Sequence, residues 1–426
     1  MIIKYKDSFI SDNSKEAAPN SYFLQSKQNQ SFVAEAKSKG AKVITVAECK
    51  KMLGIDESIK IIGVSGTNGK TTVSSAIYDI LLNLGYKCLL CGTRGVFLNK
   101  EILAEKSLTT PPILALLSYL SEAKKANCDF FIMEVSSHAI AQDRIEGLNF
   151  AAKVFTNLSQ DHLDFHKSLA EYKRVKESFF EDESLKIMNS DENFAYNPVN
   201  SITYGFKDSS DYKILSYDLD EGIKAKIEYK KEFFDVNSSL PGLFNLYNIL
   251  AASALVKELL GLDFAKVLET VRAFKGVSGR MELVADKVIV DFAHTPDGIN
   301  KVLSALKDKN LIVLFGAGGN RDKSKRPLMA KEAKKFASKL IITSDNPRDE
   351  EPQDIINDIL SGIEVDENVF VEVDRKKAIQ KALELKQKDD FVLILGKGDE
   401  NYQEIKSQKH SFSDKEVVLE FLTKLS

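Results

Sequence analysis

Tryptophan is absent from this sequence, and histidine and cysteine are scarce, with five and four residues among 426. So few cysteines exclude a disulfide-stapled fold. Hydrophobic residues make up 43% and charged residues 28%, which are ordinary values for a globular protein. The chain has no internal repeat and no low-complexity tract, and its length predicts two or three domains.

An excess of charge of either sign is also missing. The 59 Lys and Arg residues nearly balance the 62 Asp and Glu residues, which leaves a formal net charge of -3 and predicts no general attraction to nucleic acid. No uninterrupted apolar run approaches the roughly 18 to 20 residues that span a bilayer. The first residues, MIIKYKDSFISDNSKE, lack the apolar core of a signal peptide. We therefore expect a cytoplasmic protein with no nucleic-acid partner and no membrane span.

Two of the cysteines, Cys88 and Cys91, form a C-x-x-C motif, a spacing found in redox pairs and in half of a zinc site. No second pair follows, since Cys49 and Cys128 stand alone. The segment KCLLCGT has the composition of a buried strand, in which a free cysteine behaves as a small apolar residue. We therefore predict a structural role for the cysteines.

Changes in composition divide the chain into three parts. Residues 1–58 are polar with short apolar runs, which predicts a small α/β unit. From Ile61, an apolar strand, the loop SGTNGKTT and an amphipathic helix that ends at Gly85 predict the start of a parallel α/β sheet. Alternating residues between 201 and 240 predict an antiparallel insertion or sheet edge, and the turn-rich KGVSGR predicts a boundary near 277–280. The expected α/β domains span residues 1–58, 59–278 and 279–426.

Five predicted strands run directly into glycine or charged residues. They are residues 130–133, 288–290, 311–315, 340–343 and 391–395, followed by Glu134, Asp291, GAGGNRD, SDNPR and GKGDE. In open parallel sheets the ligand lies beyond the carboxyl ends of the strands. The pattern therefore predicts an extended active site.

The loop G-T-N-G-K-T-T, Gly66 to Thr72, is the strongest local motif. Its glycines allow backbone N–H groups to approach phosphate at a helix N-terminus, Lys70 suits the β- and γ-phosphates, and the Thr71 hydroxyl suits Mg²⁺. Val64 stands where a strict Walker A motif has its first glycine, so a structural glycine turn is the alternative. The position between a strand and an amphipathic helix favours nucleotide binding.

Other segments carry side chains typical of active sites. Glu134, in E-V-S-S-H, is a candidate Mg²⁺ ligand opposite Thr71, although Ser136 or Ser137 would equally suit a helix N-cap. The segments G-N-R-D-K-S-K-R-P and D-N-P-R offer arginines that bind carboxylates or phosphates, with simple turns as the alternative. A lone histidine usually packs or caps, but four of the five fall within candidate segments: His138, His162, His166 and His294.

In this order, the motifs resemble those of one family. The chain resembles the Mur ligases, ATP-dependent amide-bond-forming enzymes of peptidoglycan synthesis, and within them the branch that adds the third peptide residue. The shared motifs are G-T-N-G-K-T-T, T-T-P, E-V-S-S-H-A, F-T-N-L-S-Q-D-H-L-D-F-H, G-L-F-N-L-Y-N, G-R-M-E, D-F-A-H-T-P-D, G-N-R-D-K, D-N-P-R and G-K-G-D-E. The resemblance implies an N-terminal domain for the uridine nucleotide, a central P-loop ATPase domain and a Rossmann-like C-terminal domain for the amino acid.

ATP and Mg²⁺ are the cofactors that this resemblance implies. The implied catalytic residues are Lys70, Lys176, His162 and Glu134. The implied metal ligands are Thr71, Glu134, His162 and Lys176, the last as a carbamate, which would turn a cation into an anionic oxygen ligand. The alternative for Lys176 is an exposed helical lysine. The implied ATP contacts are Gly66, Thr67, Asn68, Gly69, Lys70, Thr71, Thr72, Asn248, Arg280 and Asp291, with His294 nearby.

The implied sugar-peptide substrate is a UDP-N-acetylmuramoyl dipeptide. The residues that match its contacts by motif are Thr109, Thr110, Ser136, Gln142 and Arg144. Ser14 is the expected uridine contact, because D-N-S-K stands where the family usually has Asp-Ser-Arg.

Within the family, D-N-P-R marks enzymes that use meso-diaminopimelate rather than L-lysine. Diaminopimelate carries an extra carboxylate that Arg348 could clamp, and a buried arginine left unpaired would reject lysine. The other carboxylate is expected at Arg321. The implied contacts are Arg321, Asp345, Asn346, Pro347, Arg348, Gly396 and Glu400. Asp399 departs from the family pattern, which commonly has histidine there.

The expected reaction is phosphoryl transfer from ATP to the D-glutamate γ-carboxylate, followed by attack of the diaminopimelate amine on the acyl phosphate. We expect a monomer. The alternatives are an L-lysine-adding synthetase, a ligase like folylpolyglutamate synthetase, and a P-loop nucleotide switch without ligation chemistry.

Overall fold

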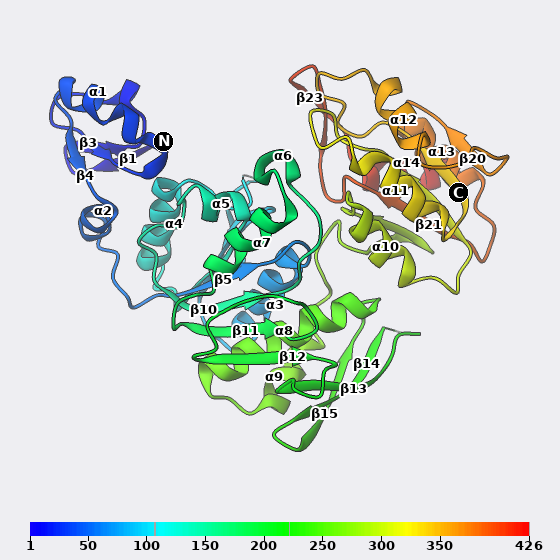
Figure 1. Ribbon diagram of the computed structural model, residues 1–426, viewed down its shortest axis with the longest axis horizontal. Helices are drawn as coiled ribbons and strands as arrows, with labels where there is room; N and C mark the ends of the chain where they lie inside the picture. Colours follow the sequence, from blue (N-terminus) through cyan, green and yellow to red (C-terminus); the bar gives the residue numbers. More distant parts are fainter. Residues whose placement is uncertain (106–107, 221, 426) are drawn as a thin grey trace.

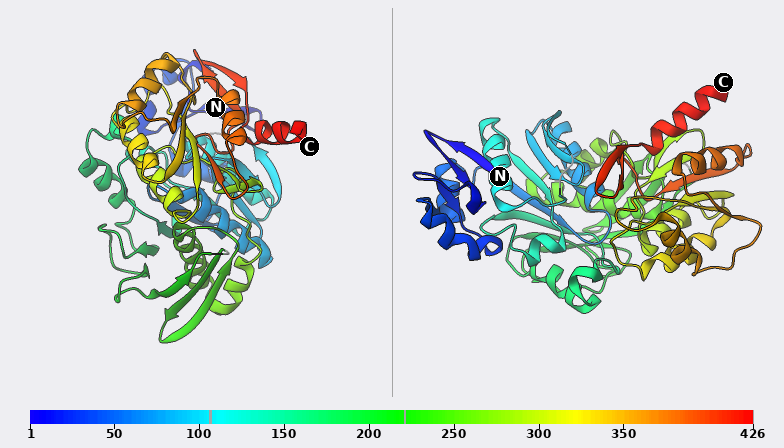
Figure 2. Two further views of the ribbon diagram at one scale, coloured as in Figure 1. Left: turned by 90° about the vertical axis from the view of Figure 1, so that its right-hand side faces the viewer. Right: turned by 90° about the horizontal axis from the view of Figure 1, so that it is seen from above.

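The computed structural model describes residues 1–105, 108–220 and 222–425. Its strands form sheets of four, eleven, six and two strands, and the first three sheets, with their helices, make three α/β domains. Figure 1 shows the four-stranded sheet at the N-terminal end, the large sheet in the middle and the six-stranded sheet on the far side. The views in Figure 2 show the C-terminal helix projecting from the last domain. The predicted fold class is confirmed.

The N-terminal sheet has the order β1-β2-β3-β4, with an antiparallel first pair and parallel pairs thereafter. Helix α2 begins at a capping box: the Thr45 side chain accepts from the Glu48 backbone N, and the Glu48 carboxylate accepts from the Thr45 backbone N at 2.8 Å. The elements are β1 (Ile2–Tyr5), β2 (Ser8–Ser11), η1 (Ser14–Glu16), β3 (Tyr22–Leu24), η2 (Lys27–Phe32), α1 (Val33–Ser38), β4 (Lys42–Ile44) and α2 (Val46–Met52).

The central sheet has the order β15-β14-β13-β12-β11-β10-β5-β9-β6-β7-β8. The pairs from β13 through β6 are parallel, and both edges are antiparallel. Its strands are β5 (Lys60–Ser65), β6 (Cys88–Gly92), β7 (Gly95–Leu98), β8 (Glu101–Ala104), β9 (Phe130–Glu134), β10 (Phe150–Phe155), β11 (Leu185–Asn189), β12 (Ser201–Gly205), β13 (Tyr212–Asp218), β14 (Ile223–Tyr229) and β15 (Glu232–Ser238). Its helices are α3 (Lys70–Asn83), α4 (Ile113–Lys125), α5 (Ser137–Ala141), α6 (Leu163–His166), α7 (Leu169–Ser178), α8 (Leu243–Leu260) and α9 (Phe264–Val271).

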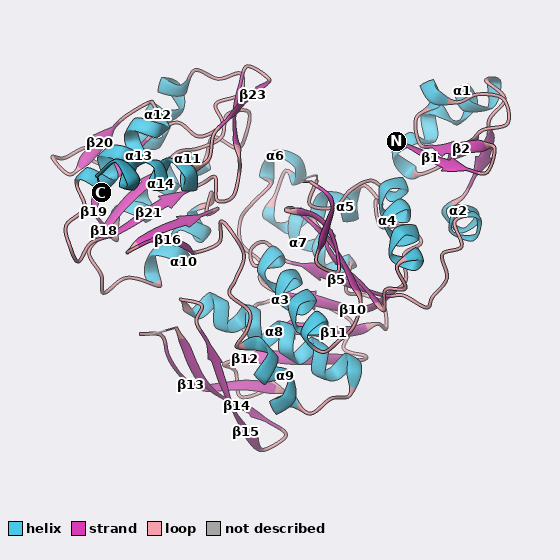
Figure 3. Cartoon of the chain, turned by 180° about the vertical axis from the view of Figure 1, so that it is seen from behind, coloured by secondary structure: helices cyan, strands magenta, loops and turns pink. Residues whose placement is uncertain are grey.

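Apolar residues cover both faces of this central sheet because parallel strands are buried on each side. Helices α3, α8 and α9 pack together on one face, as Figure 3 shows from behind, and α4 packs on the other. Helix α8 is long and apolar enough to cross a membrane, with a mean hydropathy of 1.3, but 61% of it is buried inside the protein. It is therefore a core helix.

The C-terminal sheet has the order β16-β17-β21-β18-β19-β20, parallel except for the β16–β17 pair. A hairpin, β22–β23, stands apart from it. The strands are β16 (Glu282–Ala285), β17 (Val288–Asp291), β18 (Leu311–Phe315), β19 (Ala337–Ile342), β20 (Val369–Val371), β21 (Phe391–Leu395), β22 (Tyr402–Ile405) and β23 (Gln408–Ser411). The helices are α10 (Pro296–Ser304), α11 (Lys325–Lys334), α12 (Pro352–Leu360), α13 (Arg375–Glu384) and α14 (Asp414–Leu425).

Two sequence predictions need comment here. The antiparallel segment expected at 201–240 is confirmed for β13–β15, but β12 belongs to the parallel part because it pairs with β11 in the same direction. The cysteines are free and buried, and Cys88 and Cys91 lie on β6 as predicted. Burial raises the pKa of the Cys49 thiol to about 12, as expected for an inert core residue.

Candidate active site

The glycine loop after β5 wraps closely around its neighbours. Gly66 has φ 147°, and a Cβ there would lie 1.9 Å from Thr156 Oγ1, while Gly69 begins α3 in the left-handed region at φ 85°. Lys70 Nζ donates to the carbonyl oxygens of Gly66 at 2.9 Å and Thr67 at 2.8 Å. The strand, loop and helix predicted for a nucleotide site are therefore present, with the lysine folded over its own loop.

Glu134 ends β9 beside this loop and is only 2% exposed. Thr71 Oγ1 donates to its carboxylate at 3.1 Å, and Thr93 donates to it from both its backbone N at 2.9 Å and its Oγ1 at 3.1 Å. A Cβ on Gly92 would lie 2.2 Å from Glu134 Oε1, so glycine is needed to admit the carboxylate. The predicted Thr71–Glu134 pair is brought together, and Ser136 also caps α5 as the alternative proposed.

Lys176 lies at the same loop rather than in solvent. It is 1% exposed, and its Nζ donates to the Gly66 carbonyl at 2.8 Å, so the exposed-lysine alternative is wrong. Burial, reinforced by repulsion from Lys70, holds the Lys176 pKa well below its ordinary value. Its Nζ stands 5.0 Å from the centre of the Tyr172 ring.

His162 also lies near Tyr172, with ring centres 6.3 Å apart. Its backbone has φ 55°, and its Nε2 lies 3.4 Å from the Asp161 carboxylate. His138 stacks edge-on against it with ring centres 4.8 Å apart, and His166 Nε2 pairs with Ser137 Oγ at 2.8 Å. Three of the four histidines from the candidate segments are thus in contact, and the fourth, His294, lines the cavity described below. Within the described residues, no three His, Cys, Asp or Glu side chains form a metal cluster by themselves.

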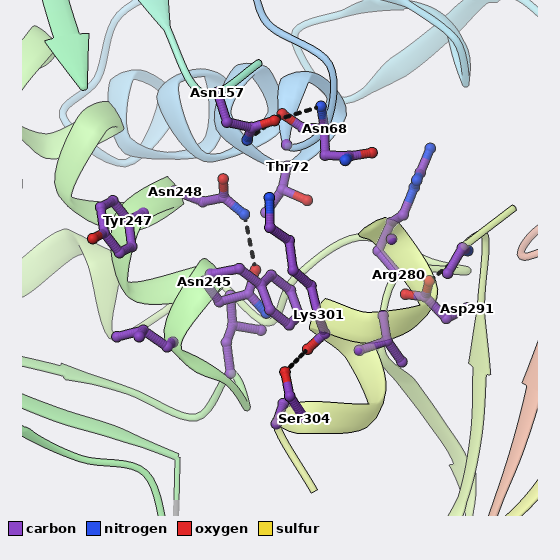
Figure 4. A pocket seen from close by; sticks show the side chains of 18 of the residues that line it. Asn68, Thr72, Asn157, Asn245, Tyr247, Asn248, Arg280, Asp291, Lys301 and Ser304 are labelled. Atoms are coloured by element: carbon purple, nitrogen blue, oxygen red, sulfur yellow. Dashed lines mark hydrogen bonds between the residues drawn. The ribbon is translucent and has the colours of Figure 1, made fainter. Parts of the chain in front are cut away.

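A cavity of about 640 Å³ opens between the glycine loop and the C-terminal domain. Figure 4 shows Asn68, Thr72, Asn248, Arg280 and Asp291 on its wall. Six of the ten predicted ATP residues therefore line one space, and the other four, Gly66, Thr67, Lys70 and Thr71, are not among its lining residues. Its volume lies in the range of small-molecule sites.

Two of these residues, Asp291 and Arg280, belong to the C-terminal part of the chain. Asp291 accepts from the backbone N of Met281 and of Ala293, both at 2.6 Å, and the Arg280 guanidinium lies 4.4 Å from the Phe292 ring centre. Burial raises the Asp291 pKa. Its carboxylate thus ties the turn that carries Arg280 to the end of β17.

The glycine loop touches the C-terminal domain directly. Asn68 Nδ2 donates to Asp297 Oδ2 at 2.8 Å, and Ser159 Oγ donates to the same oxygen at 3.0 Å. Asp297 begins α10 and pairs with Lys301 at 3.0 Å. This contact joins the nucleotide loop to the domain that carries D-N-P-R.

The residues expected for the sugar-peptide form a second network beside Glu134. Thr110 Oγ1 donates to the Glu134 carbonyl at 2.9 Å, Ser136 N donates to Thr110 Oγ1 at 3.0 Å, and Arg144 Nη1 donates to the Thr110 carbonyl at 2.8 Å. Gln142 Oε1 accepts from Arg144 and from Gln28 Nε2, at 2.9 Å for the latter.

The two remaining residues predicted for this substrate, Thr109 and Ser14, lie in different places. Thr109 joins this network through Thr93, with the hydroxyls 3.0 Å apart. Ser14 lies in the N-terminal domain, where its Oγ donates to Glu35 at 2.8 Å. Gln28 was missed from the sequence because its segment carries no motif.

The D-N-P-R segment and the loop after β21 form a partly buried polar cluster at the place where the sequence predicts the amino-acid pocket. Asn346 Nδ2 donates to Glu400 Oε2 at 2.8 Å, and Arg348 donates to Glu404 Oε2 at 3.0 Å and to the Gly319 carbonyl at 2.8 Å. Arg348 has φ 51°, in the left-handed region that residues with a side chain rarely adopt. A Cβ on Gly396 would lie 2.5 Å from Asp345 Oδ2.

Other parts of this pocket were placed less well by sequence. Pro347 lies in the turn, and a Cβ on Gly319 would lie 1.9 Å from its carbonyl oxygen. Arg321 is exposed and donates only to the neighbouring Asn320 carbonyl among the described residues, so it is not brought into the pocket. Lys397 and Glu404 were missed, since a lysine between two glycines looks like a turn.

Comparison with known proteins matches two large parts of the chain to one family. The family model of the Mur ligase middle domain matches residues 64–256, and that of the Mur ligase glutamate ligase domain matches residues 279–398. A protein of Wolinella succinogenes, a UDP-N-acetylmuramoyl-L-alanyl-D-glutamate–2,6-diaminopimelate ligase, is 47% identical over 97% of this chain and 96% of its own length. One of the same name from Helicobacter pylori is 45% identical over 98% and 96%.

Solved structures give the same answer. A structure of a ligase of that name is 31% identical, with a TM-score of 0.67 over 98% of this chain and 95% of that one. The folylpolyglutamate synthase of Mycobacterium tuberculosis reaches the same TM-score at 15% identity, over 82% of this chain and 91% of that one, which reflects the shared fold alone. From its motifs, its matched domains and its full-length relatives, the chain belongs to the Mur ligase family.

Proposed function

We propose that this protein is an ATP-dependent ligase that joins meso-diaminopimelate to UDP-N-acetylmuramoyl-L-alanyl-D-glutamate in peptidoglycan precursor synthesis. The observation that carries this proposal is identity of 45% or more, over nearly the whole length, to ligases named for that reaction. The D-N-P-R pocket supports it independently, because its arginine and carboxylates suit an amino acid with charges of both signs at its far end.

The ATP side is assigned to the glycine loop and the 640 Å³ cavity. Residues 66–72 would surround the phosphates, with Lys70 turning from its own loop carbonyls toward them. Asn248 and Arg280 would contact the nucleotide from opposite walls, with Asp291 holding the turn that carries Arg280.

The residues around Glu134 fit Mg²⁺. Thr71 Oγ1 and the Glu134 carboxylate are oxygen donors that already meet at 3.1 Å, and Mg²⁺ prefers oxygen ligands. When bound, the ion would neutralise charge on the transferred phosphoryl group. We assign a second position to His162 and Lys176, which both lie near Tyr172.

Lys176 fits a metal only after modification, because an amine is a poor partner for Mg²⁺. Its low pKa supplies the neutral amine needed to add to CO₂, which forms an N–C bond and releases a proton. The resulting carbamate presents oxygens next to the glycine loop.

The sugar-peptide is assigned to Thr109, Thr110, Ser136, Gln142 and Arg144, which lie between Glu134 and the N-terminal domain. Ser14 is proposed for the uridine. Diaminopimelate is assigned to 345–348, Gly396 and Glu400, with Arg321 proposed at the pocket entrance. We propose domain boundaries at 58/59 and 278/279, supported by the family match that begins at 279, and a cytoplasmic monomer.

In the proposed reaction the D-glutamate γ-carboxylate attacks the γ-phosphorus of ATP, and ADP leaves. The diaminopimelate amine then attacks the acyl phosphate and expels phosphate to form the amide. The Asn68–Asp297 contact would hold the two domains together while the acyl phosphate exists, which excludes the water that would hydrolyse it.

Phosphate release tests this function. Purified protein is given ATP, Mg²⁺ and the UDP-N-acetylmuramoyl dipeptide with meso-diaminopimelate, with L-lysine or with neither. We expect turnover only with diaminopimelate. Turnover with lysine would keep the family and refute the proposed specificity. The absence of turnover with both amino acids would refute the ligase.

A further inference from the structure

Lys397 is the most completely enclosed charge in the amino-acid pocket. It lies between two glycines after β21 and is 0% exposed. Its Nζ lies 2.8 Å from Glu400 Oε2, 3.0 Å from Asn346 Oδ1 and 3.8 Å from Asp345 Oδ1. A buried ammonium with three fixed partners is a rigid part of the pocket rather than a surface charge.

Lys397 determines which way the Asn346 amide points. Asn346 Oδ1 accepts from Lys397 Nζ and from the Glu404 backbone N at 2.9 Å, while its Nδ2 donates to Glu400 Oε2. The reversed amide would turn its NH₂ toward two donors and its oxygen toward a carboxylate. The Asn346 donor group is therefore fixed on the Glu400 side.

Lys397 also balances the carboxylates that diaminopimelate would meet. Arg348 is paired with Glu404, and Arg375 is paired with Asp414 through two hydrogen bonds of 2.7 and 2.8 Å. Among the described residues, Lys397 is thus the one cation within ion-pair distance of either Asp345 or Glu400. Without it, two carboxylates would face the far end of the substrate with no cation beside them.

That imbalance would change which amino acid fits. Two uncompensated carboxylates would attract the single ammonium of lysine and repel the extra carboxylate of diaminopimelate. With Lys397 in place, the neutralised carboxylates hold an ammonium without rejecting the carboxylate beside it.

We propose that Lys397 is a positioning residue that sets selectivity for an amino acid whose side chain ends in a zwitterion rather than in a lone ammonium. It acts through Glu400 and Asn346. The inference rests on the proposed function, because it places the far end of diaminopimelate in this pocket.

The test uses Lys397→Met, which removes the charge at similar volume, and Lys397→Gln as a second variant that keeps a donor for Asn346. Lys186→Met is the matched control, because Lys186 is also 0% exposed but donates to the Asp182 and Ser184 carbonyls in the central domain. The KM and kcat for diaminopimelate, the KM for ATP, and the ratio of the two products from mixed diaminopimelate and excess lysine are measured.

We expect Lys397→Met and Lys397→Gln to raise the KM for diaminopimelate by about tenfold or more, the effect of losing a charge-assisted hydrogen bond. The KM for ATP should stay within about twofold, and the product ratio should shift toward lysine by about tenfold. The control should leave both the KM and the ratio unchanged. An unchanged ratio in folded Lys397 variants, or equal losses with both amino acids, would overturn the inference.

Arg348→Ala distinguishes a wrong assignment of the amino-acid pocket from a wrong role for Lys397. If it leaves the KM for diaminopimelate unchanged, the pocket itself is misplaced and the proposed assignment fails. If it raises that KM while the Lys397 variants keep the wild-type ratio, only the role of Lys397 fails.

Discussion

The glycine-loop site and the amino-acid pocket both enclose lysines, but the partners of those lysines differ. Lys70 and Lys176 donate to the Gly66 carbonyl, and among the described residues neither is ion-paired with a carboxylate. Lys397, in contrast, is paired with Glu400 at 2.8 Å. The first site therefore keeps Lys70 free of a carboxylate partner for a polyanion such as ATP and keeps Lys176 available for carbamate formation, whereas the second site is neutralised in advance for a zwitterion.

Removing a lysine from the first site should have the largest effect. We expect Lys70→Met to lower kcat by about 1,000-fold, because the variant loses a cation where charge develops on the transferred phosphoryl group. Phosphate release under saturating substrates measures this, with thermal melting as the check on folding. Activity above a tenth of wild type would contradict the proposed role of Lys70.

The next largest effect is expected at Lys176, the second lysine of the glycine-loop site. We expect Lys176→Ala to lower activity by about 100-fold or more, since the carbamate oxygens are lost. Added formate or acetate should restore part of the activity by placing a carboxylate in the space. Full activity of the unrescued variant would end the carbamate proposal.

Arg348→Ala should impair the amino-acid pocket and spare the glycine-loop site. The arginine stands in the amino-acid pocket, and its loss should lower kcat/KM for diaminopimelate by about 100-fold, the effect of about two charge-assisted hydrogen bonds. The KM for ATP should stay within about threefold. Steady-state kinetics in both substrates gives the two values, and equal losses would contradict a role confined to the pocket.

The smallest effect is expected at Asp399, where this chain departs from the family pattern. Arg94 Nε lies 3.4 Å from Asp399 Oδ2, and both side chains are partly exposed. Such pairs contribute little, so Asp399→Asn should change kcat/KM by less than about threefold. A loss of 100-fold would assign Asp399 a direct part in the reaction.

The sequence predicted the glycine-loop site better than the pocket. The loop lies between a continuous apolar strand and an amphipathic helix, so local pattern alone predicted that Lys70 and Thr71 stand at the start of that helix. Thr93 was missed because it meets Glu134 across two neighbouring strands, 41 residues apart, and carries no motif.

The pocket was harder to predict because its contacts are long-range and polar. Asn346 and Glu404 are 58 residues apart in the sequence. Glu404 lies in the hairpin β22–β23, whose second strand, Gln408–Ser411, is exposed and lacks apolar alternation. A site role for Lys176 was predicted only from the family resemblance. The residue pattern alone favoured an exposed lysine, since a helix rich in Glu and Lys predicts a solvated face and the contact with Gly66 is made 110 residues away.

The central claim is that this ligase selects a zwitterionic side-chain end. The most direct measurement is the mass of the product formed from equal concentrations of meso-diaminopimelate and L-lysine with ATP, Mg²⁺ and the UDP-N-acetylmuramoyl dipeptide. We predict the diaminopimelate tripeptide as the product, with ADP and phosphate in equal amounts. A lysine-containing tripeptide as the main product would contradict the account.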